Sequence, residues 1–448
     1  MQTISSDANQ SQAIASAFSQ RRALMPFWGQ QALEAEAWPA AWQEMNQAPL
    51  LVNSLAYVHI PFCANRCVFC GFYKNAWKEE RGTPYVDRVI ADLQHAAASR
   101  VAGGSIAAVY LGGGTPTALS GPDLARLLRA LQQYLPLSDD CEITVEGRIS
   151  HFDRSKIDAC LEAGANRFSI GVQTFHTPLR RHLGRKHSGE DAAAYLAELA
   201  AGQEAVVVAD LMFGLPGQDE AIWANDLDVA LGLGLDGIDV YAFNLFPGLP
   251  IQRMLEKGVF PPMSGLPTQL GLYQMALDRF AAAGWQQLSN SHFGSGLGRE
   301  RNRYNLAIKS GHSCVAFGSG AGGSHAGYAY SIESDLERYL NAASPAIARV
   351  SRADPSQHWV AALQGGIEIG QIDASLLPTA CLPLLQSWQQ QGLITPLQNS
   401  LWSIAPLARF WGPSMARALV DCSVVKPKSR TTDGTEKMEF HGEKQSLK

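Results

Sequence analysis

Short apolar runs alternate with longer periodic stretches between residues 51 and 245. A short apolar run bounded by turn residues is typical of a strand buried in a parallel sheet. Apolar residues that recur every three or four positions are typical of an amphipathic helix. The pattern predicts six strands, which span residues 55–60, 107–111, 142–146, 167–170, 206–213 and 237–243.

Helices are predicted between these strands. Thr83 before Pro84 has the form of an N-cap followed by the first helical position. The apolar stripe after the second strand consists of Leu124, Leu127, Leu128 and Leu131. Later helices are predicted at 153–163, 190–201 and 220–231. Six strand–helix units are fewer than the eight of a closed barrel. The predicted fold class is therefore α/β, an open, partial (β/α)6 barrel whose open side admits a large flat substrate.

The flanks of this region break the alternation. Residues 1–50 are expected to form a lead-in that covers the substrate, and 51–335 the core with its extension, which carries Gly/Ser-rich loops between 289 and 330. Residues 346–422 are expected to form a small, mainly helical domain with a winged-helix-like pattern near its end. No basic stripe accompanies that pattern, which favours packing or substrate covering over DNA binding. Residues 426–448 are charged, poor in apolar residues and predicted to be disordered.

Composition and charge narrow the class of protein. A hydrophobic content of 46%, a charged content of 17% and a net charge of −5 describe a globular protein with no nucleic-acid footprint. No stretch reaches the apolar length of a membrane span, and the first twenty residues lack the pattern of a signal peptide. The eight cysteines are not spaced like a disulfide framework. We therefore expect a cytoplasmic protein with no nucleic-acid and no membrane partner.

Three of the cysteines cluster just after the first predicted strand. Cys63, Cys67 and Cys70 form a C-x3-C-x2-C loop. Electron-transfer iron–sulfur clusters normally take four cysteines, so three closely spaced thiolates suit a cubane cluster with one iron free of protein ligands. Zinc prefers four ligands, usually in two paired spacings. The spacing favours an iron–sulfur cluster over a zinc site or a redox thiol.

Further candidate residues follow the other predicted strands. In parallel α/β folds, functional sites form at the carboxyl ends of the strands. A glycine run at 112–114 and Thr115 follow the second strand, and Glu146 ends the third. The residues near the ends of the fourth and fifth strands are Gln173, Arg185 and Asp210. Each side chain taken alone has an alternative as a solvated group or a rim ion pair, but their shared position favours a common site.

These motifs resemble the radical S-adenosylmethionine (SAM) enzymes. The similarity is closest to their coproporphyrinogen dehydrogenase subgroup, runs from about residue 57 to residue 324, and includes Tyr57-x-His59-Ile60-Pro61-Phe62-Cys63. It implies a 4Fe–4S cluster on the three cysteines, with SAM on the fourth iron as the source of a deoxyadenosyl radical. It also implies a second SAM beside the first. The residues implied for the first SAM are Tyr57, Phe69, Gly113 and Glu146, and those for the second are Gly114, Thr115, Gln173, Arg185 and Asp210.

Two departures select a branch of this subgroup. The porphyrinogen oxidases carry Tyr-Thr-Ser-Tyr-Pro upstream of the cluster, a region that here reads FSQRRALMPF at 18–27. The heme chaperones begin near their cluster loop and carry His-Asn-x-x-Tyr-Trp, where this chain has Arg301 in place of the histidine. The chain is similar to the anaerobilin synthases, which degrade heme anaerobically, in three features: its lead-in, its length of 448 residues and Arg301.

The similarity implies heme as substrate and a flavodoxin or ferredoxin as electron donor. The implied reaction transfers a methyl group from the second SAM to a meso carbon of heme, and yields a methylated linear tetrapyrrole and free iron. Two alternatives stay open, an oxygen-independent coproporphyrinogen oxidase and a heme chaperone without enzymatic activity.

Contacts with heme are harder to assign from the sequence. Arg21 and Arg22 suit propionates, although a solvated helix face is the simpler interpretation. His292 and His325 are candidate iron ligands, although a lone histidine is more often structural. The aromatic residues that either cover a porphyrin face or anchor the lead-in are Phe27, Trp28, Trp38 and Trp42.

Overall fold

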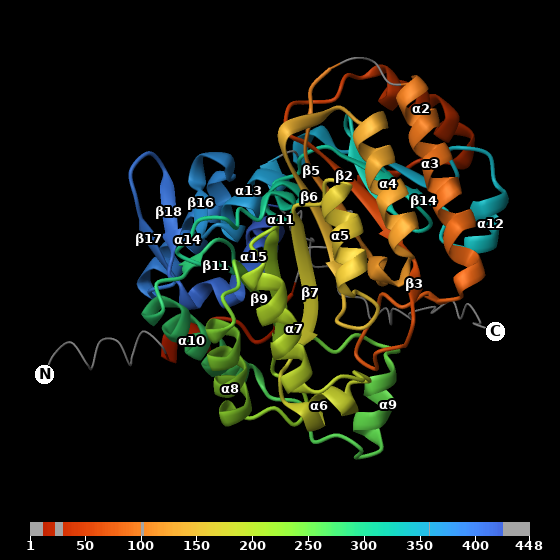
Figure 1. Cartoon of the computed structure of the whole chain (residues 1–448). Coiled ribbons are helices and arrows are strands. Elements are labelled where there is room, and N and C mark those ends of the chain that lie inside the picture. The colour runs from red at the N-terminus through yellow and green to blue at the C-terminus, as the bar shows by residue number, and fades with distance from the viewer. Residues whose placement is uncertain (1–11, 23–29, 100–102, 358, 424–448) are drawn as a thin grey trace, which may run out of the picture.

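A 13-stranded sheet organises the computed structural model, which describes residues 12–22, 30–99, 103–357 and 359–423 (Figure 1). Its central strands pair in parallel and follow one another in chain order. They are β2 (Ser54–Ile60), β5 (Ile106–Gly113), β6 (Leu137–Gly147), β7 (Arg167–Gln173), β8 (Val206–Phe213) and β9 (Gly237–Ala242). These are the six predicted strands, so the predicted α/β fold with a partial barrel is confirmed.

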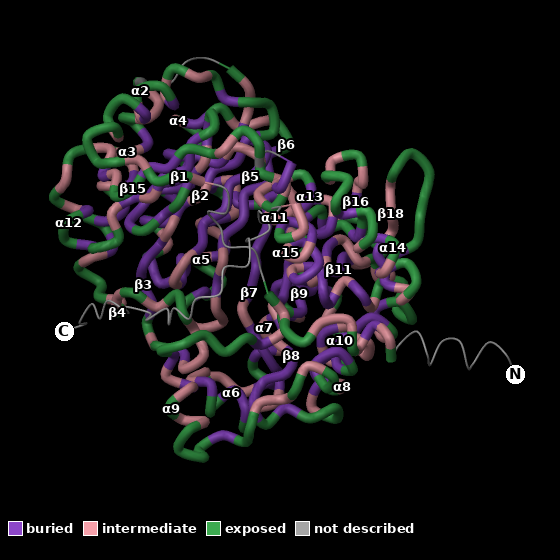
Figure 2. Tube along the Cα trace, turned by 180° about the vertical axis from the view of Figure 1, so that it is seen from behind, coloured by how far each residue is buried: buried purple, intermediate pink, exposed green. Residues whose placement is uncertain are grey.

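Helices cross between the parallel strands and cover the outer face of the sheet (Figure 1). They include α3 (Gly82–Ser99), α4 (Gly121–Tyr134), α5 (Arg154–Glu162), α7 (Gly189–Ala201) and α8 (Glu220–Gly232). In α4, the four leucines of the predicted stripe are fully buried against the sheet. Figure 2 shows the buried stretches gathered along the strands, while exposed stretches follow the outer loops and helix faces.

The predicted N-cap at Thr83 is wrong. Helix α3 begins at Gly82, directly after the 3-10 turn η2 (Glu79–Arg81). A Cβ atom at Gly82 would lie 2.8 Å from the Trp77 ring, so only glycine fits there. The Thr83 hydroxyl instead donates to Asp123 Oδ2 on α4, at 3.0 Å. A tertiary contact has therefore replaced the local capping bond that the sequence pattern suggested.

The sheet continues beyond both ends of the parallel array, which the sequence pattern did not predict. On the β2 side, β12 (Cys314–Phe317) is parallel to β2. Antiparallel strands follow it, namely β13 (Gly322–His325), β14 (Tyr328–Ile332), β15 (Ile347–Ala353) and β1 (Gln30–Ala32). On the other side, β11 (His292–Gly294) and β10 (Gln286–Gln287) extend the sheet from β9. Loops do occur between 289 and 330, as predicted, but short strands lie among them. The sequence pattern did not predict these strands, because strands of three or four residues are too short to show a period.

The C-terminal part forms a small unit beside β9 and β11 (Figure 1). Its helices are α13 (Trp359–Glu368), α14 (Leu382–Gln390) and α15 (Gly412–Ser423), and its antiparallel strands are β16 (Gln371–Asp373), β18 (Leu401–Ile404) and β17 (Ile394–Pro396).

The first described residues of the lead-in pack on this unit. Phe18 contacts the rings of Trp388 and Trp411, and the Trp411 indole N–H donates to the Ile14 carbonyl at 2.7 Å. Farther along the lead-in, β1 pairs with β15 at the opposite edge of the sheet, and α2 (Trp38–Gln47) follows. The lead-in therefore contacts both ends of the sheet.

None of the described helices is both long and apolar enough to cross a membrane. The predicted tail at 426–448 lies outside the described residues.

Candidate active site at the carboxyl end of the barrel

The cysteine loop leaves the carboxyl end of β2 through the short strand β3 (Phe62–Cys63), which pairs with β4 (Asn75–Ala76). Cys63 and Cys67 are buried and Cys70 is partly exposed, and all three thiols are free. The loop is held from the far side of the barrel, because the Asn65 amide donates to the Gly184 carbonyl at 2.8 Å. The predicted cysteines therefore lie together at the edge where the parallel strands end.

The surroundings of these thiols fit the thiolate ligands of an iron–sulfur cluster. Burial raises the pKa of Cys63, whereas the Thr115 hydroxyl at 3.6 Å from its sulfur and the nearby Arg148 guanidinium lower it. The Phe72 N–H donates to the Cys70 sulfur at 3.3 Å. Such donors to sulfur stabilise metal-bound thiolates and tune a cluster. Among the described residues, no three Cys, His, Asp or Glu side chains converge on a single-ion position. In a cubane cluster each thiolate binds a different iron, so its ligands need not converge in that way.

The glycine run at the end of β5 passes directly against the cysteine loop. Gly113 has a φ of +111°, and a Cβ atom there would lie 2.6 Å from the His59 ring. A Cβ atom at Gly114 would lie 2.5 Å from the Phe62 carbonyl oxygen. Only glycine fits these positions, so the run keeps a backbone surface free of side chains beside the three thiols.

The residues predicted for the first SAM line the same edge. Glu146 at the end of β6 accepts hydrogen bonds from the Tyr110 hydroxyl at 2.7 Å and from the Gly113 N–H at 3.2 Å. Desolvation raises the pKa of Glu146, and these two hydrogen bonds oppose the shift. The Tyr57 hydroxyl lies 2.9 Å from His59 Nδ1. Burial lowers the pKa of His59 to about 4, with Lys74 contributing, so this imidazole is neutral at pH 7.

Three residues predicted for the second SAM converge around Gly171. A Cβ atom at Gly171 would lie 3.1 Å from Gln173 Nε2, 3.6 Å from Arg185 Nη2 and 3.9 Å from Asp210 Oδ2. Gly171 and Asp210 are register partners on β7 and β8. Gln173 ends β7 with a φ of +76°, a conformation that non-glycine residues adopt mainly where the surrounding structure enforces it. The structure therefore gathers residues that lie up to 39 positions apart in the chain.

The charges around Gly171 are complementary but unpaired. Desolvation raises the pKa of Asp210 to about 7, and the carboxylates of Asp239 and Glu146 contribute. The Arg185 guanidinium donates to the Gly171 carbonyl at 3.0 Å, while its buried Nε atom has no partner in the described structure. A carboxyl group and a guanidinium that face the same space suit a ligand that carries both a cation and a carboxylate.

A small pocket with a strongly basic lining lies next to this pair. Its charged lining residues are Arg148, Arg180, Arg185, Lys186 and His187. Desolvation, with a smaller contribution from the neighbouring Arg185, lowers the pKa of Arg180 to about 10. The cavity reaches Asn65 of the cysteine loop and Gly171 of β7, so it joins the two halves of the candidate site.

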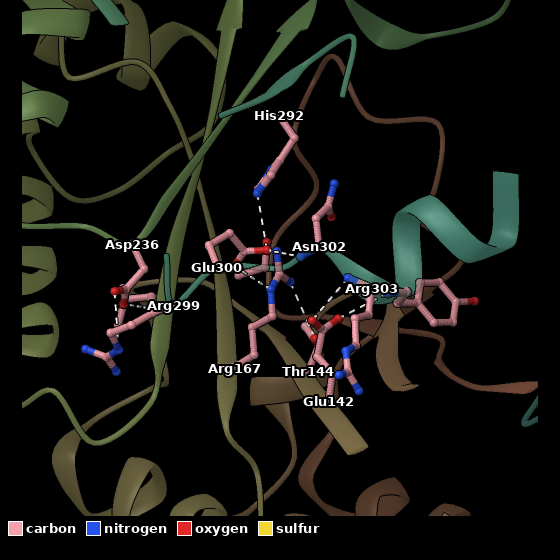
Figure 3. A network of polar contacts seen from close by, with 12 residues as sticks. Glu142, Thr144, Arg167, Asp236, His292, Arg299, Glu300, Asn302 and Arg303 are labelled. Atoms are coloured by element: carbon pink, nitrogen blue, oxygen red, sulfur yellow. Dashed lines mark hydrogen bonds and ion pairs between the residues drawn. The ribbon is translucent and has the colours of Figure 1, made fainter. Parts of the chain in front are cut away.

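A buried ionic network that was not predicted from the sequence lies in the same part of the barrel, and Figure 3 shows its residues Arg167, Glu300 and His292. Arg167 at the start of β7 contacts Glu300 at 2.9 Å, and Glu300 lies 3.3 Å from His292 Nε2. The other ring nitrogen of His292 lies 2.9 Å from Asp239 on β9. His292 is fully buried with both nitrogens facing carboxylates, which agrees with the structural role that a lone histidine more often has and not with iron ligation.

The second candidate iron ligand is also occupied. The ring nitrogens of His325 lie 3.2 Å from the Ser313 hydroxyl and 3.1 Å from the Ala48 carbonyl oxygen. Arg21 does not face the candidate site, because its guanidinium lies over the Phe410 ring, 4.6 Å from the centroid.

The described aromatic residues of the lead-in anchor it to the core. The Trp38 indole donates to the Leu33 carbonyl at 2.9 Å, and Trp42 packs edge-on against Tyr330 at 5.2 Å between ring centroids. This arrangement favours the anchoring role for both residues. Phe27 and Trp28 lie outside the described residues.

Comparisons with known proteins agree with this geometry. Residues 57–230 match the model of the radical SAM superfamily. The solved structure of coproporphyrinogen III oxidase from Escherichia coli has the same fold, with a TM-score of 0.75 and 21% identity, and the match covers 92% of this chain and 98% of that one. The fold and the three-cysteine loop thus define a radical SAM enzyme.

Proteins related in sequence identify the family within this class more narrowly. The chain is 42% identical to anaerobilin synthase from Escherichia coli O157:H7 over 411 residues, which cover 90% of this chain and 92% of the relative. It is 31% identical to the heme chaperone HemW from Bacillus subtilis over 272 residues, which cover 60% of this chain and 70% of the relative. The chain belongs to the anaerobilin synthase family within the radical SAM enzymes.

Proposed function

We propose that the protein opens heme in the absence of oxygen, by transferring a methyl group to a meso carbon and releasing iron and a linear tetrapyrrole. The observation that carries this proposal is the convergence of Gln173, Arg185 and Asp210 around Gly171, directly beside the three-cysteine loop. The similarity to anaerobilin synthase over nine tenths of the chain supports the choice of substrate.

Each part of the site has a role in this proposal. Cys63, Cys67 and Cys70 would hold a 4Fe–4S cluster, which supplies the electron that cleaves SAM. Beside it, the first SAM would contact Tyr57, Phe69, Gly113 and Glu146. The free backbone surface of the glycine run leaves room for that ligand, and Glu146 presents a carboxyl group to its hydroxyl or ammonium groups.

The second SAM would occupy the space around Gly171. Arg185 would pair with its carboxylate and Asp210 with its ammonium or ribose, while Gly114, Thr115 and Gln173 complete the contacts. The unpaired state of the Arg185 Nε atom supports this assignment. These residues act by holding the methyl donor in a fixed orientation and by excluding water from the reacting atoms.

The proposal also covers the lead-in, the electron donor and the location of the protein. We propose that residues 1–50 cover the substrate, because their described parts contact both ends of the sheet. We also propose a flavodoxin or ferredoxin as electron donor and a cytoplasmic location. All eight cysteines are described and free of disulfides, which supports a reducing compartment.

An anaerobic assay tests this function. Protein with a reconstituted cluster is incubated with reductant, SAM and heme, and the products are followed by absorbance and mass spectrometry. Loss of the Soret band together with a methylated open tetrapyrrole is the expected result. Carbon dioxide release from coproporphyrinogen, without methylation, would instead indicate an oxidase. Heme that stays intact and co-elutes with the protein would indicate a chaperone.

A further inference from the structure

The floor of the barrel below Asp210 holds four buried charged side chains. Arg167, Asp239, His292 and Glu300 are all at most 5% exposed. They come from β7, β9, β11 and the segment before α11 (Arg303–Lys309), and they contact one another in a chain from Arg167 to Asp239. Figure 3 shows the part of this chain from Arg167 through Glu300 to His292. Isolated charges at this depth cost several kcal/mol each, so their contacts must compensate one another.

Both cations of this network lie in contact with its carboxyl groups, Arg167 with Glu300 and His292 with Glu300 and Asp239. Burial lowers the pKa of His292, but the contacts with Asp239 and Glu300 outweigh it and raise the pKa to about 9. Burial raises the pKa of Glu300, but Arg167 and His292 outweigh it and lower the pKa to about 2. At neutral pH Arg167 and His292 are therefore cations and Glu300 is an anion, and Asp239 supplies the second carboxyl group that faces His292.

These contacts leave the carboxyl groups above the network without a cationic partner. In the described part of the chain, no Lys, Arg or His nitrogen lies within 4.0 Å of the carboxylate of Asp210 or Glu146. Asp210 accepts a hydrogen bond from the Ser169 hydroxyl at 3.1 Å, and Glu146 accepts those from Tyr110 and Gly113. Neutral donors orient these carboxyl groups but do not cancel their charge.

Asp239 is the link between the network and Asp210. The two residues are register partners on the neighbouring parallel strands β8 and β9, so their side chains leave the same face of the sheet. The carboxylate of Asp239 opposes the ionisation of Asp210. His292 counters this effect, because its Nδ1 atom lies 2.9 Å from Asp239 Oδ2. The state of Asp210 thus depends on a histidine from an antiparallel strand outside the barrel repeat.

We propose that His292 is a positioning residue for the second SAM, since its positive charge neutralises Asp239 and thereby keeps Asp210 available as the anion that binds the cationic part of that ligand. This inference rests on the proposed function, in which Asp210 contacts the second SAM. It assigns to His292 a role in ligand affinity in place of the iron ligation that the sequence suggested.

The sign of the pH dependence follows from the same groups. Asp210 is protonated below a pH of about 7 and ionised above it, so binding of a cation there strengthens as pH rises through that value. A neutral residue at 292 leaves Asp239 unbalanced and moves this rise to higher pH. The charged or titratable groups that influence Asp210 are Tyr110, Glu146, Arg167, Arg185, Asp239 and Tyr241.

The test is a pH series of SAM binding to the cluster-loaded, full-length protein. Binding is measured by equilibrium dialysis from about pH 6 to about pH 8.5, where His292 still carries its charge in the native protein. The second binding equivalent is identified by its loss in Asp210→Asn.

Three variants separate the proposed role from a merely structural one. His292→Asn keeps a donor near Asp239 without the charge, and we expect the pH midpoint of the second equivalent to rise by about one unit. Asp239→Asn removes the opposing anion, and we expect the midpoint to fall by a similar amount. The double variant should return the midpoint close to that of the native protein.

The outcomes discriminate between the inference and the function beneath it. If the protein binds two equivalents of SAM but the pH midpoint of the second does not move in His292→Asn and Asp239→Asn, only the role of His292 is overturned. One equivalent in the native protein would overturn the two-SAM site and this inference with it. If His292→Asn fails to fold, the other two variants decide the question. The proposal then requires a lower pH midpoint in Asp239→Asn and a midpoint near the native value in the double variant, and any other result overturns it.

Discussion

At the residue scale, the site holds the carboxyl group of Asp210 and the guanidinium of Arg185 close to Gly171, and among the described residues neither forms an ion pair. Desolvation and the neighbouring Asp239 raise the pKa of Asp210, and desolvation lowers the pKa of Arg185. A ligand with a cation and a carboxylate relieves both penalties at once, because each buried group then gains a charge-assisted hydrogen bond. The cysteine loop beside them supplies three sulfurs and a partly exposed edge at Cys70.

Replacement of one cysteine tests the assignment of the loop. We expect Cys67→Ala to lose the brown cluster chromophore and all cleavage of SAM, because the cluster then lacks one of its three ligands. Cys160→Ala is the matched control, since Cys160 is also buried but lies on α5, outside the loop. Formation of deoxyadenosine by Cys67→Ala would contradict the ligand assignment.

Replacement of Asp210 tests the second SAM site. We expect Asp210→Ala to abolish methyl transfer while some unproductive SAM cleavage continues, because the cluster and the first SAM do not depend on this carboxylate. Product masses and deoxyadenosine yields are measured in the same reaction. Asp228→Ala, which removes an exposed carboxylate on α8, is the control. Methylation at the native rate in Asp210→Ala would exclude Asp210 from this site.

At the element scale, the carboxyl end of β7 sets the geometry of the site. It carries Gly171, then the strained Gln173, and it lies between β6 with Glu146 and β8 with Asp210. The parallel register therefore brings three chemically different side chains to one edge without any long loop. The small size of Gly171 is what allows Gln173 and Arg185 to approach its Cα.

A methyl group at Gly171 should disturb this arrangement without unfolding the protein. We expect Gly171→Ala to weaken SAM binding roughly tenfold, because the new Cβ atom lies 3.1 Å from Gln173 Nε2 and must displace a flexible side chain rather than backbone. Gly232→Ala at the end of α8 meets nothing within 4 Å and should bind SAM like the native protein. Equal affinities of the two variants would contradict the assigned role of β7.

At the scale of the whole molecule, the barrel is extended on both sides and tied together by contacts between distant segments. The lead-in packs on the C-terminal unit, β12 adds to the β2 side, and β11 places His292 under the site. Glu300 and Arg167 are separated by 133 residues yet form a buried ion pair at 2.9 Å. The ionic network therefore couples the fold of the later segments to the floor of the barrel.

This network predicts how stability depends on pH. The pKa of His292 is raised in the folded state to about 9, so its contribution to stability is complete below the unfolded value of about 6.5 and is lost as pH rises through about 9. We expect the urea midpoint of the native protein to fall over that window and the fall to be smaller in His292→Asn. An equal fall in both proteins would exclude His292 as its source.

The sequence was sufficient for the features that depend on local pattern. The six parallel strands, the cysteine loop and the glycine run all have strong short-range signals. The strands β11, β12 and β13 were missed because each has at most four residues, and because β11 and β12 pair with the distant strands β9 and β2. The contacts of His292 could not be predicted, because nothing near it in the sequence indicates that Asp239 and Glu300 surround it in the fold.

The most direct test of the whole account is the fate of a deuterium-labelled SAM methyl group in an anaerobic reaction with heme. The account predicts deuterium in two products, the linear tetrapyrrole that receives the methyl carbon and the 5′-deoxyadenosine that takes a hydrogen from it. Opened tetrapyrrole without the label, or heme recovered intact beside unlabelled deoxyadenosine, would contradict the proposed methyl transfer.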